Sequence, residues 1–146
     1  EILTMTIERI FIDKLFAAEA YTRTAEKEHR AFEASKHIYD LAVIASEPRI
    51  VSLLQDKEQL AKLLKIRLTE EQNRLDGIPG VLPKDFIFFE KACTNTHITK
   101  AYTTMQNQYV FIPDDRISLD DAQYQLHCLQ DQLNLNPAWS LTTIRE

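Results

Sequence analysis

The most suggestive polar pattern in the sequence is a run of carboxylates and imidazoles in its first third. It consists of Glu26, His29, Glu33 and His37, which are three, four and four positions apart, so one continuous helix would place them on one face. Di-iron and di-manganese bundles take Glu-x-x-His from each of two helices, and Glu26 with His29 supplies one copy. No other histidine has a glutamate three positions before it. We therefore predict no metal centre and interpret the stripe as a solvated helix face, with a metal site as the alternative.

Arginines in the same segment offer a second alternative. Arg23 and His29 are separated by five residues, and Arg30 and His37 by six. This spacing resembles the Arg-x4–6-His signature of the helical HEPN ribonuclease fold. The resemblance implies an RNase in which His37 acts as general base beside a phosphate-binding arginine. In that family the motif lies late in the bundle, whereas here it lies early, which argues against the resemblance. A helical hydrolase, metal-dependent or HEPN-like, that uses the Glu26–His37 stripe is therefore the alternative function and not the leading one.

The two cysteines carry little chemistry of their own. Cys93 and Cys128 are far apart and form neither a disulfide-like pattern nor a metal-ligand motif, which favours a reducing compartment and hence the cytoplasm. Cys93 lies four positions before His97, a spacing that could activate a thiolate, but no third orienting group is evident. We interpret both cysteines as structural thiols.

Composition limits the classes of protein to which the chain can belong. Its 146 residues are 45% hydrophobic and 27% charged, which is typical of a globular domain. The only glycines are Gly77 and Gly80, too few for hairpins or for the glycine-rich loops that bind nucleotide phosphates. The net charge of −5 disfavours nucleic acid as a partner. No apolar run approaches the ~20 residues of a membrane span.

Apolar periodicity predicts an all-α fold. We expect helices over 3–21, 24–46, 47–54, 56–68, 83–92, 96–109 and 118–133, and a last one after 136. Polar residues at their starts are the candidate N-caps: Thr24, Ser46, Asp56, Thr96 and Ser118. The breaks near Thr24 and Asp56 are left open, as is a buried strand in place of the helix over 83–92, so we predict an irregular bundle of about six or seven helices. The Gly/Pro segment 75–83 is predicted to be a loop. The chain begins without methionine inside a helical stripe, so we interpret residues 1–146 as a single helical domain, a fragment of a longer protein.

Aromatic residues supply the candidate binding surface. Phe86, Phe88 and Phe89 belong to an apolar run after the glycine loop, and Trp139 lies near the C-terminal end. Aromatic side chains of this kind are enriched in protein interfaces, although burial in the chain's own core explains them equally well. Because no catalytic constellation is evident, we predict a non-catalytic helical protein–protein interaction module, an adaptor, regulatory or chaperone-like domain, without a cofactor. Its partner would be another protein or the remainder of its own polypeptide.

Overall fold

Helices dominate the part of the chain that the structure describes. The computed structural model describes residues 6–75 and 77–140, and these ranges contain no β-strand, which confirms the all-α prediction. The seven α-helices of this part are α1 (Ile7–Thr22), α2 (Glu28–Ile44), α3 (Pro48–Leu54), α4 (Lys57–Glu71), α5 (Phe88–Thr94), α6 (Thr96–Tyr109) and α7 (Leu119–Leu135). Short 3-10 helices begin at prolines: η1 (Pro83–Asp85), η2 (Pro113–Asp115) and η3 (Pro137–Ser140). None of the helices described here has the length and apolar character needed to cross a bilayer.

Side-chain caps fix the beginnings of four helices. Thr6, Asp56, Asn95 and Ser118 each accept a hydrogen bond from the backbone N–H three residues later, at 3.0 to 3.1 Å. Such a cap satisfies a backbone donor that has no partner within the helix and contributes ~1 kcal/mol. The caps at Asp56 and Ser118 confirm the sequence-based expectation. The cap expected at Thr96 is one residue earlier, at Asn95.

The two other caps that the sequence suggested are wrong, because their hydroxyl groups bond elsewhere. Residues 23–26 form turns, and α2 begins after Lys27, which makes no side-chain cap bond. Thr24 Oγ1 instead accepts a hydrogen bond from Arg30 Nε at 2.7 Å. Ser46 Oγ donates to the carbonyl of Val43 at 3.3 Å, and the N-cap of α3 is the next residue, Glu47.

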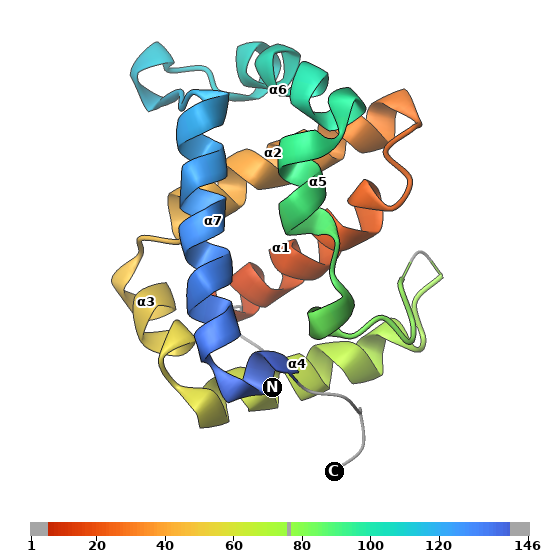
Figure 1. The fold of residues 1–146 in the computed structure, drawn as a ribbon, viewed down its shortest axis with the longest axis vertical. Coiled ribbons are helices and arrows are strands. Elements are labelled where there is room, and N and C mark those ends of the chain that lie inside the picture. Colours follow the sequence, from red (N-terminus) through yellow and green to blue (C-terminus); the bar gives the residue numbers. More distant parts are fainter. Residues whose placement is uncertain (1–5, 76, 141–146) are drawn as a thin grey trace.

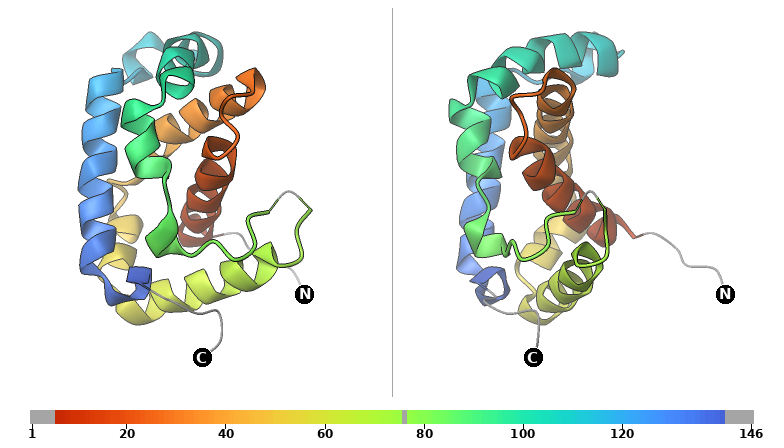
Figure 2. Two further views of the ribbon diagram at one scale, coloured as in Figure 1. Left: turned by 45° about the vertical axis from the view of Figure 1, so that its right-hand side comes forward. Right: turned by 90° about the vertical axis from the view of Figure 1, so that its right-hand side faces the viewer.

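Helix α1 lies at the centre of the fold. Its Phe11, Ile12, Leu15 and Phe16 are at most 1% exposed, and α1 contacts α2, α3, α4 and α5. Figure 1 shows α5 and α7 in front of α1 and α2, with α6 across one end and α3 and α4 at the other. The turned views in Figure 2 separate these two layers. The apolar face of α1 thus forms the centre of the core.

The Gly/Pro segment leaves the helical path after α4, as predicted. Residues 77–82 contain no helix, and Gly80 has a φ of 84°, in the left-handed region that favours glycine. Glu71 Oε1 anchors this loop by accepting a hydrogen bond from the backbone N–H of Ile78 at 2.7 Å. A Cβ on Gly77 would lie 2.5 Å from that same oxygen, so only glycine fits there without a shift.

The segment after the loop differs in detail from its prediction. The single helix expected over 83–92 is divided into η1 and α5, because Phe86 has an extended backbone between them. The last expected helix is present as η3, a 3-10 helix that ends at Ser140. The rest of the expected last helix, residues 141–146, lies outside the described residues.

Candidate functional site

A lysine and an aspartate meet between α1 and α2. Lys14 Nζ lies 3.0 Å from Asp40 Oδ2, and the two side chains are 29% and 11% exposed. Both positions border the core, since the neighbouring Leu15 and Leu41 are fully buried. The carboxylate holds the ammonium group in place at the edge of the core. Because the Lys14 side chain remains partly exposed, an anionic ligand can approach this pair from solvent.

Tyr109 of α6 completes this Lys14–Asp40 pair. Its hydroxyl donates to Asp40 Oδ1 at 3.2 Å. Burial, and after it the charge of Asp40, raises the pKa of Tyr109, so the phenol remains a hydrogen-bond donor. The ring of Tyr39 packs edge-on against Tyr109 with centroids 6.2 Å apart, and Lys36 Nζ lies 5.2 Å from the same ring. Asp40 therefore has both carboxylate oxygens engaged, one by Lys14 and one by Tyr109.

A buried histidine lies one helical turn before Asp40. His37 is 8% exposed, and its ring stacks on Tyr21 of α1 with centroids 5.7 Å apart. Burial, and after it the charge of Lys14, lowers the pKa of His37 to about 4, so the imidazole is neutral at neutral pH. Its Nδ1 has no hydrogen-bond partner in the described part of the chain. His37 consequently adds no positive charge beside Lys14.

Ion pairs on a neighbouring face of α1 join it to α4. The side chain of Arg67 is 6% exposed and contacts Asp13 at 2.6 Å and Glu71 at 2.5 Å. Arg9 pairs with Asp13 at 2.9 Å and also with Glu70. Each buried charge thus has a partner of opposite sign, as burial in a low-dielectric interior requires. We interpret this network as structural, because it fixes α4 against the central helix.

The structure places the four residues of the Glu26–His37 stripe, the alternative metal site, in different surroundings. Glu26 lies in the turn before α2, and both Glu26 and His29 are exposed. Glu33 pairs with Lys36 at 3.2 Å, while His37 is buried against Tyr21. In the described residues, no group of three or more His, Cys, Asp or Glu side chains could hold a metal ion. The stripe required one continuous helix, and the turn before α2 separates Glu26 from it. His29, Glu33 and His37 keep their four-residue spacing on α2, but they differ in burial and in their contacts.

The arginines of the HEPN-like spacing have other contacts. Arg23 Nε pairs with Glu19 Oε2 at 2.7 Å, and the guanidinium of Arg30 lies 4.2 Å from the centroid of the Tyr21 ring. Glu19, which is fully buried, also accepts hydrogen bonds from the backbone N–H groups at the start of α5, at 2.9 Å from Ile87 and from Phe88. Arg23 therefore belongs to the anchoring of α5 rather than to a phosphate site.

The four aromatic residues predicted as an interface lie in or against the core. Phe88, Phe89 and Trp139 are buried, and Phe86 is half-buried. The Phe86 ring packs edge-on against both Phe16 and Trp139, with centroids 5.2 and 5.5 Å away. These side chains thus join α1, η3 and the start of α5 within the chain. A contact with a partner protein at these residues stays a prediction.

The described part of the chain is all-helical and has a half-buried lysine–carboxylate pair at its surface. Both binding domains and enzymes have such an arrangement. Residues 1–130 match the family described as "Nucleotidyl transferase AbiEii toxin, Type IV TA system". The chain belongs to this family of enzymatic toxins. Comparisons with curated proteins and with solved structures gave no match.

The family overturns the functional prediction made from the sequence. A non-catalytic adaptor or chaperone-like module is wrong for a family of nucleotidyl transferase toxins, and the hydrolase alternative is not supported either. The sequence analysis looked for reactive residues within one local motif. Lys14 and Asp40 are 26 positions apart on two helices, and they come together only through packing. The sequence signal that could have indicated this pair is that each helix has a charged residue next to a strongly apolar core position, Lys14 beside Leu15 and Asp40 beside Leu41.

Proposed function

We propose that this chain takes part in nucleotidyl transfer and that Lys14 binds the phosphate group that reacts. The observation that carries the proposal is the half-buried Lys14–Asp40 pair in a member of a nucleotidyl transferase family. An ammonium group that is anchored by a carboxylate yet still accessible to water is suited to a phosphate oxygen. Asp40 and Tyr109 act as positioning residues, because they orient Lys14 rather than contact the nucleotide.

Nucleotidyl transfer needs positive charge near the phosphorus atom that reacts, the α-phosphorus of the nucleotide. An acceptor nucleophile forms a new bond to the α-phosphorus of a nucleoside triphosphate, the bond from that phosphorus to the bridging oxygen breaks, and pyrophosphate leaves. Negative charge is spread over the non-bridging oxygens during this exchange, and a pre-oriented cation stabilises it without reorganisation. The Lys14 ammonium group supplies that cation, and the nucleophile's proton passes to solvent.

Divalent cations commonly assist phosphoryl transfer. The Lys14–Asp40 pair does not fit a metal cage, because Asp40 is its one carboxylate and both of its oxygens already accept hydrogen bonds. No further acidic, cysteine or histidine side chains of the described residues gather around it in a group of three. No step is therefore assigned to a metal ion here.

The proposal is tested by substituting Lys14. We expect Lys14→Ala to reduce the transfer of label from α-³²P nucleoside triphosphates to acceptors in a cell extract by roughly 100-fold, the usual effect of removing one transition-state contact. Asp40→Asn should lower kcat more than it raises KM, since it disturbs the orientation of Lys14. Growth arrest on expression of the full chain should weaken in parallel.

A matched control comes from a second ion pair that joins α1 to another helix. Arg49 of α3 pairs with Glu8 at 2.8 Å, outside the Lys14–Asp40 pair, so Arg49→Ala should leave transfer unchanged. Lys14→Arg keeps the charge with different geometry and should retain part of the activity. Full transfer by a folded Lys14→Ala chain would contradict the proposal.

The family description also indicates which kind of protein the partner is. We propose that the partner is a protein antitoxin that opposes this activity, because the family is named as the toxin of a type IV toxin–antitoxin system. Co-expression with such an antitoxin should restore growth without a substitution in the toxin. The sequence analysis predicted a protein partner, and the present proposal specifies that partner as an antitoxin.

A further inference from the structure

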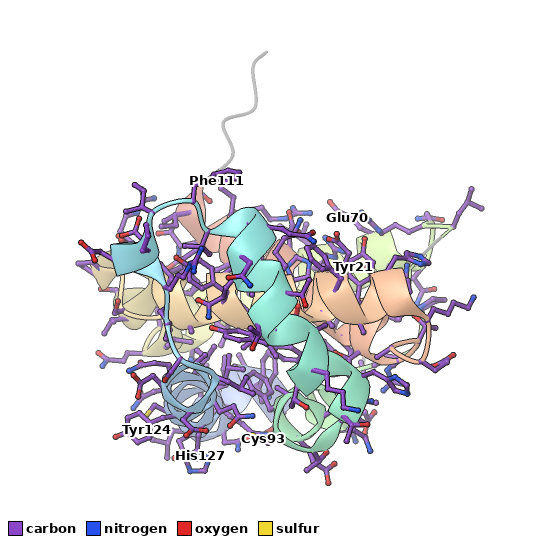
Figure 3. All side chains as sticks on the ribbon, turned by 90° about the horizontal axis from the view of Figure 1, so that it is seen from above. Tyr21, Glu70, Cys93, Phe111, Tyr124 and His127 are labelled. Atoms are coloured by element: carbon purple, nitrogen blue, oxygen red, sulfur yellow. The ribbon has the colours of Figure 1, made fainter. Side chains whose placement is uncertain are left out.

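A cavity of about 160 Å³ lies on the outer side of α1, between the first turns of α2 and the last turn of α4. Its lining includes Arg30, Arg67 and Arg74 together with Glu71, and two small residues of α1, Ala17 and Ala20. Figure 3 labels Tyr21 of α1 and Glu70 of α4 along this side of the molecule, away from Tyr124 and His127 of α7. The lining thus combines three cations with one carboxylate in a chain whose net charge is −5.

The three guanidinium groups are held in different ways. Arg67 is fixed by its pairs with Asp13 and Glu71. Arg30 lies over the ring of Tyr21, and in the described part of the chain it forms no ion pair; it donates instead to Thr24 Oγ1 and to the carbonyl of Ala20, at 2.7 and 3.4 Å.

Arg74 is the least constrained of the three. It lies 3.8 Å from Glu71, and its side chain is 52% exposed. Since Glu71 is shared with Arg67, the one carboxylate of the lining leaves positive charge uncompensated in the cavity. A guanidinium of this kind can turn its planar donor fork toward a phosphate.

We propose that this cavity binds the polyphosphate of the nucleotide, which rests on the proposed nucleotidyl transfer. Ala17 lies three residues after Lys14 on α1, so the two positions share one helix face, ~4.5 Å apart along the axis. Lys14 lies outside the lining, so a phosphate chain that rests on Ala17 and Ala20 would leave the cavity past Ala17 to reach Lys14, with Arg30 and Arg74 at its other end. The small alanine side chains leave room for it, and the arginines neutralise the pyrophosphate that leaves.

The test is calorimetric titration of the full chain with inorganic tripolyphosphate, at low salt and without a divalent cation. We expect one site, whose affinity falls about tenfold in Arg30→Gln and in Arg74→Gln, because each variant removes a charge-assisted contact. Arg49→Gln is the control, since Arg49 is an arginine of another ion pair outside the cavity, and its affinity should equal that of the unmodified chain. Raising the salt concentration should weaken binding.

A steric variant tests the same cavity without a change of charge. Ala17→Leu extends a side chain into the cavity and should weaken tripolyphosphate binding by about tenfold. Ala101→Leu makes the same change at a half-buried position of α6 that lines a different cavity, and it should have no effect. Circular dichroism establishes that each variant is folded before it is titrated.

The outcomes separate this inference from the proposed function. Absence of tripolyphosphate binding, or binding that is insensitive to Arg30→Gln, Arg74→Gln and Ala17→Leu, overturns the polyphosphate site even if transfer depends on Lys14. Binding that responds to these variants supports the site. If such binding accompanies transfer that is insensitive to Lys14→Ala, the proposed role of Lys14 fails while the anion site stands.

Discussion

The ring of His37 is held in surroundings that disfavour its charged form. It is stacked on Tyr21, it is almost fully buried, and Lys14 lies nearby, so its pKa falls to about 4. In an unfolded chain the pKa of a histidine is ~6.5. Below pH 6.5 the unfolded chain therefore gains a proton that the folded chain does not bind. Stability that is present above pH 6.5 is lost as the pH falls toward 4.

This difference gives a prediction for the pH dependence of unfolding. Between pH 7.5 and pH 5 the linkage lowers the free energy of unfolding by about 2 kcal/mol through His37 alone. His37→Phe keeps an aromatic ring on Tyr21 and removes the titrating group, so the drop measured by urea denaturation should shrink by that amount. His29→Phe is the control, because His29 is exposed. An unchanged drop in the His37→Phe chain would contradict the assignment.

At the scale of elements, local sequence rules set most helix boundaries. Proline positions and polar caps at Asp56 and Ser118 gave correct starts, since they act on backbone groups within one turn. The break between α1 and α2 could not be fixed in this way, because Thr24 binds the side chain of Arg30 rather than the backbone. The start of α5 depends on Glu19, which is 69 positions from Phe88, and no local rule shows that contact.

The site was harder to predict than the helices for the same reason. The stripe from Glu26 to His37 has a helical spacing, but the turn before α2 takes Glu26 out of the helix. Packing then buries His37 against Tyr21 and leaves His29 exposed, which the spacing does not show. The Lys14–Asp40 pair depends on how α1 packs against α2. The packing of two helices against each other cannot be read from the local pattern of a single sequence. Periodicity told which helix faces are buried, but not which charged residues meet at their edges.

The loop after α4 allows a prediction with an internal comparison. Alanine at position 77 would meet Glu71 Oε1 and disturb its bond to Ile78, so Gly77→Ala should lower the free energy of unfolding by about 2 kcal/mol. At Gly80 nothing lies within 4 Å of an added Cβ, and the cost is that of the positive φ, about 1 kcal/mol. Urea denaturation of both variants measures the difference. A larger loss for Gly80→Ala would show that Glu71 does not anchor the loop.

In the molecule as a whole, α1 supplies both the core and the polar groups that join it to its neighbours. Glu8 pairs with α3, Asp13 with α4 and Lys14 with α2. Glu19 holds the start of α5. Burial differs along this series, since the side chain of Glu19 is 0% exposed and that of Lys14 is 29% exposed. Buried charges are costly to disturb, whereas accessible pairs contribute little to stability and remain available to a ligand.

This gradient predicts that stability and activity respond to different residues. Lys14→Ala removes a partly exposed partner and leaves Asp40 hydrogen-bonded to Tyr109, so it should cost ~1 kcal/mol of unfolding free energy, yet it should abolish most nucleotidyl transfer. Glu19→Gln weakens charge-assisted bonds to Ile87 and Phe88 and should cost about 2 kcal/mol, with transfer unchanged wherever the chain is folded. Urea denaturation and the transfer assay on the same preparations measure both effects. Loss of both stability and activity in Lys14→Ala, with no loss of either in Glu19→Gln, would contradict this prediction. The Lys14–Asp40 pair would then be a structural contact, and Glu19 would not be needed to hold α5.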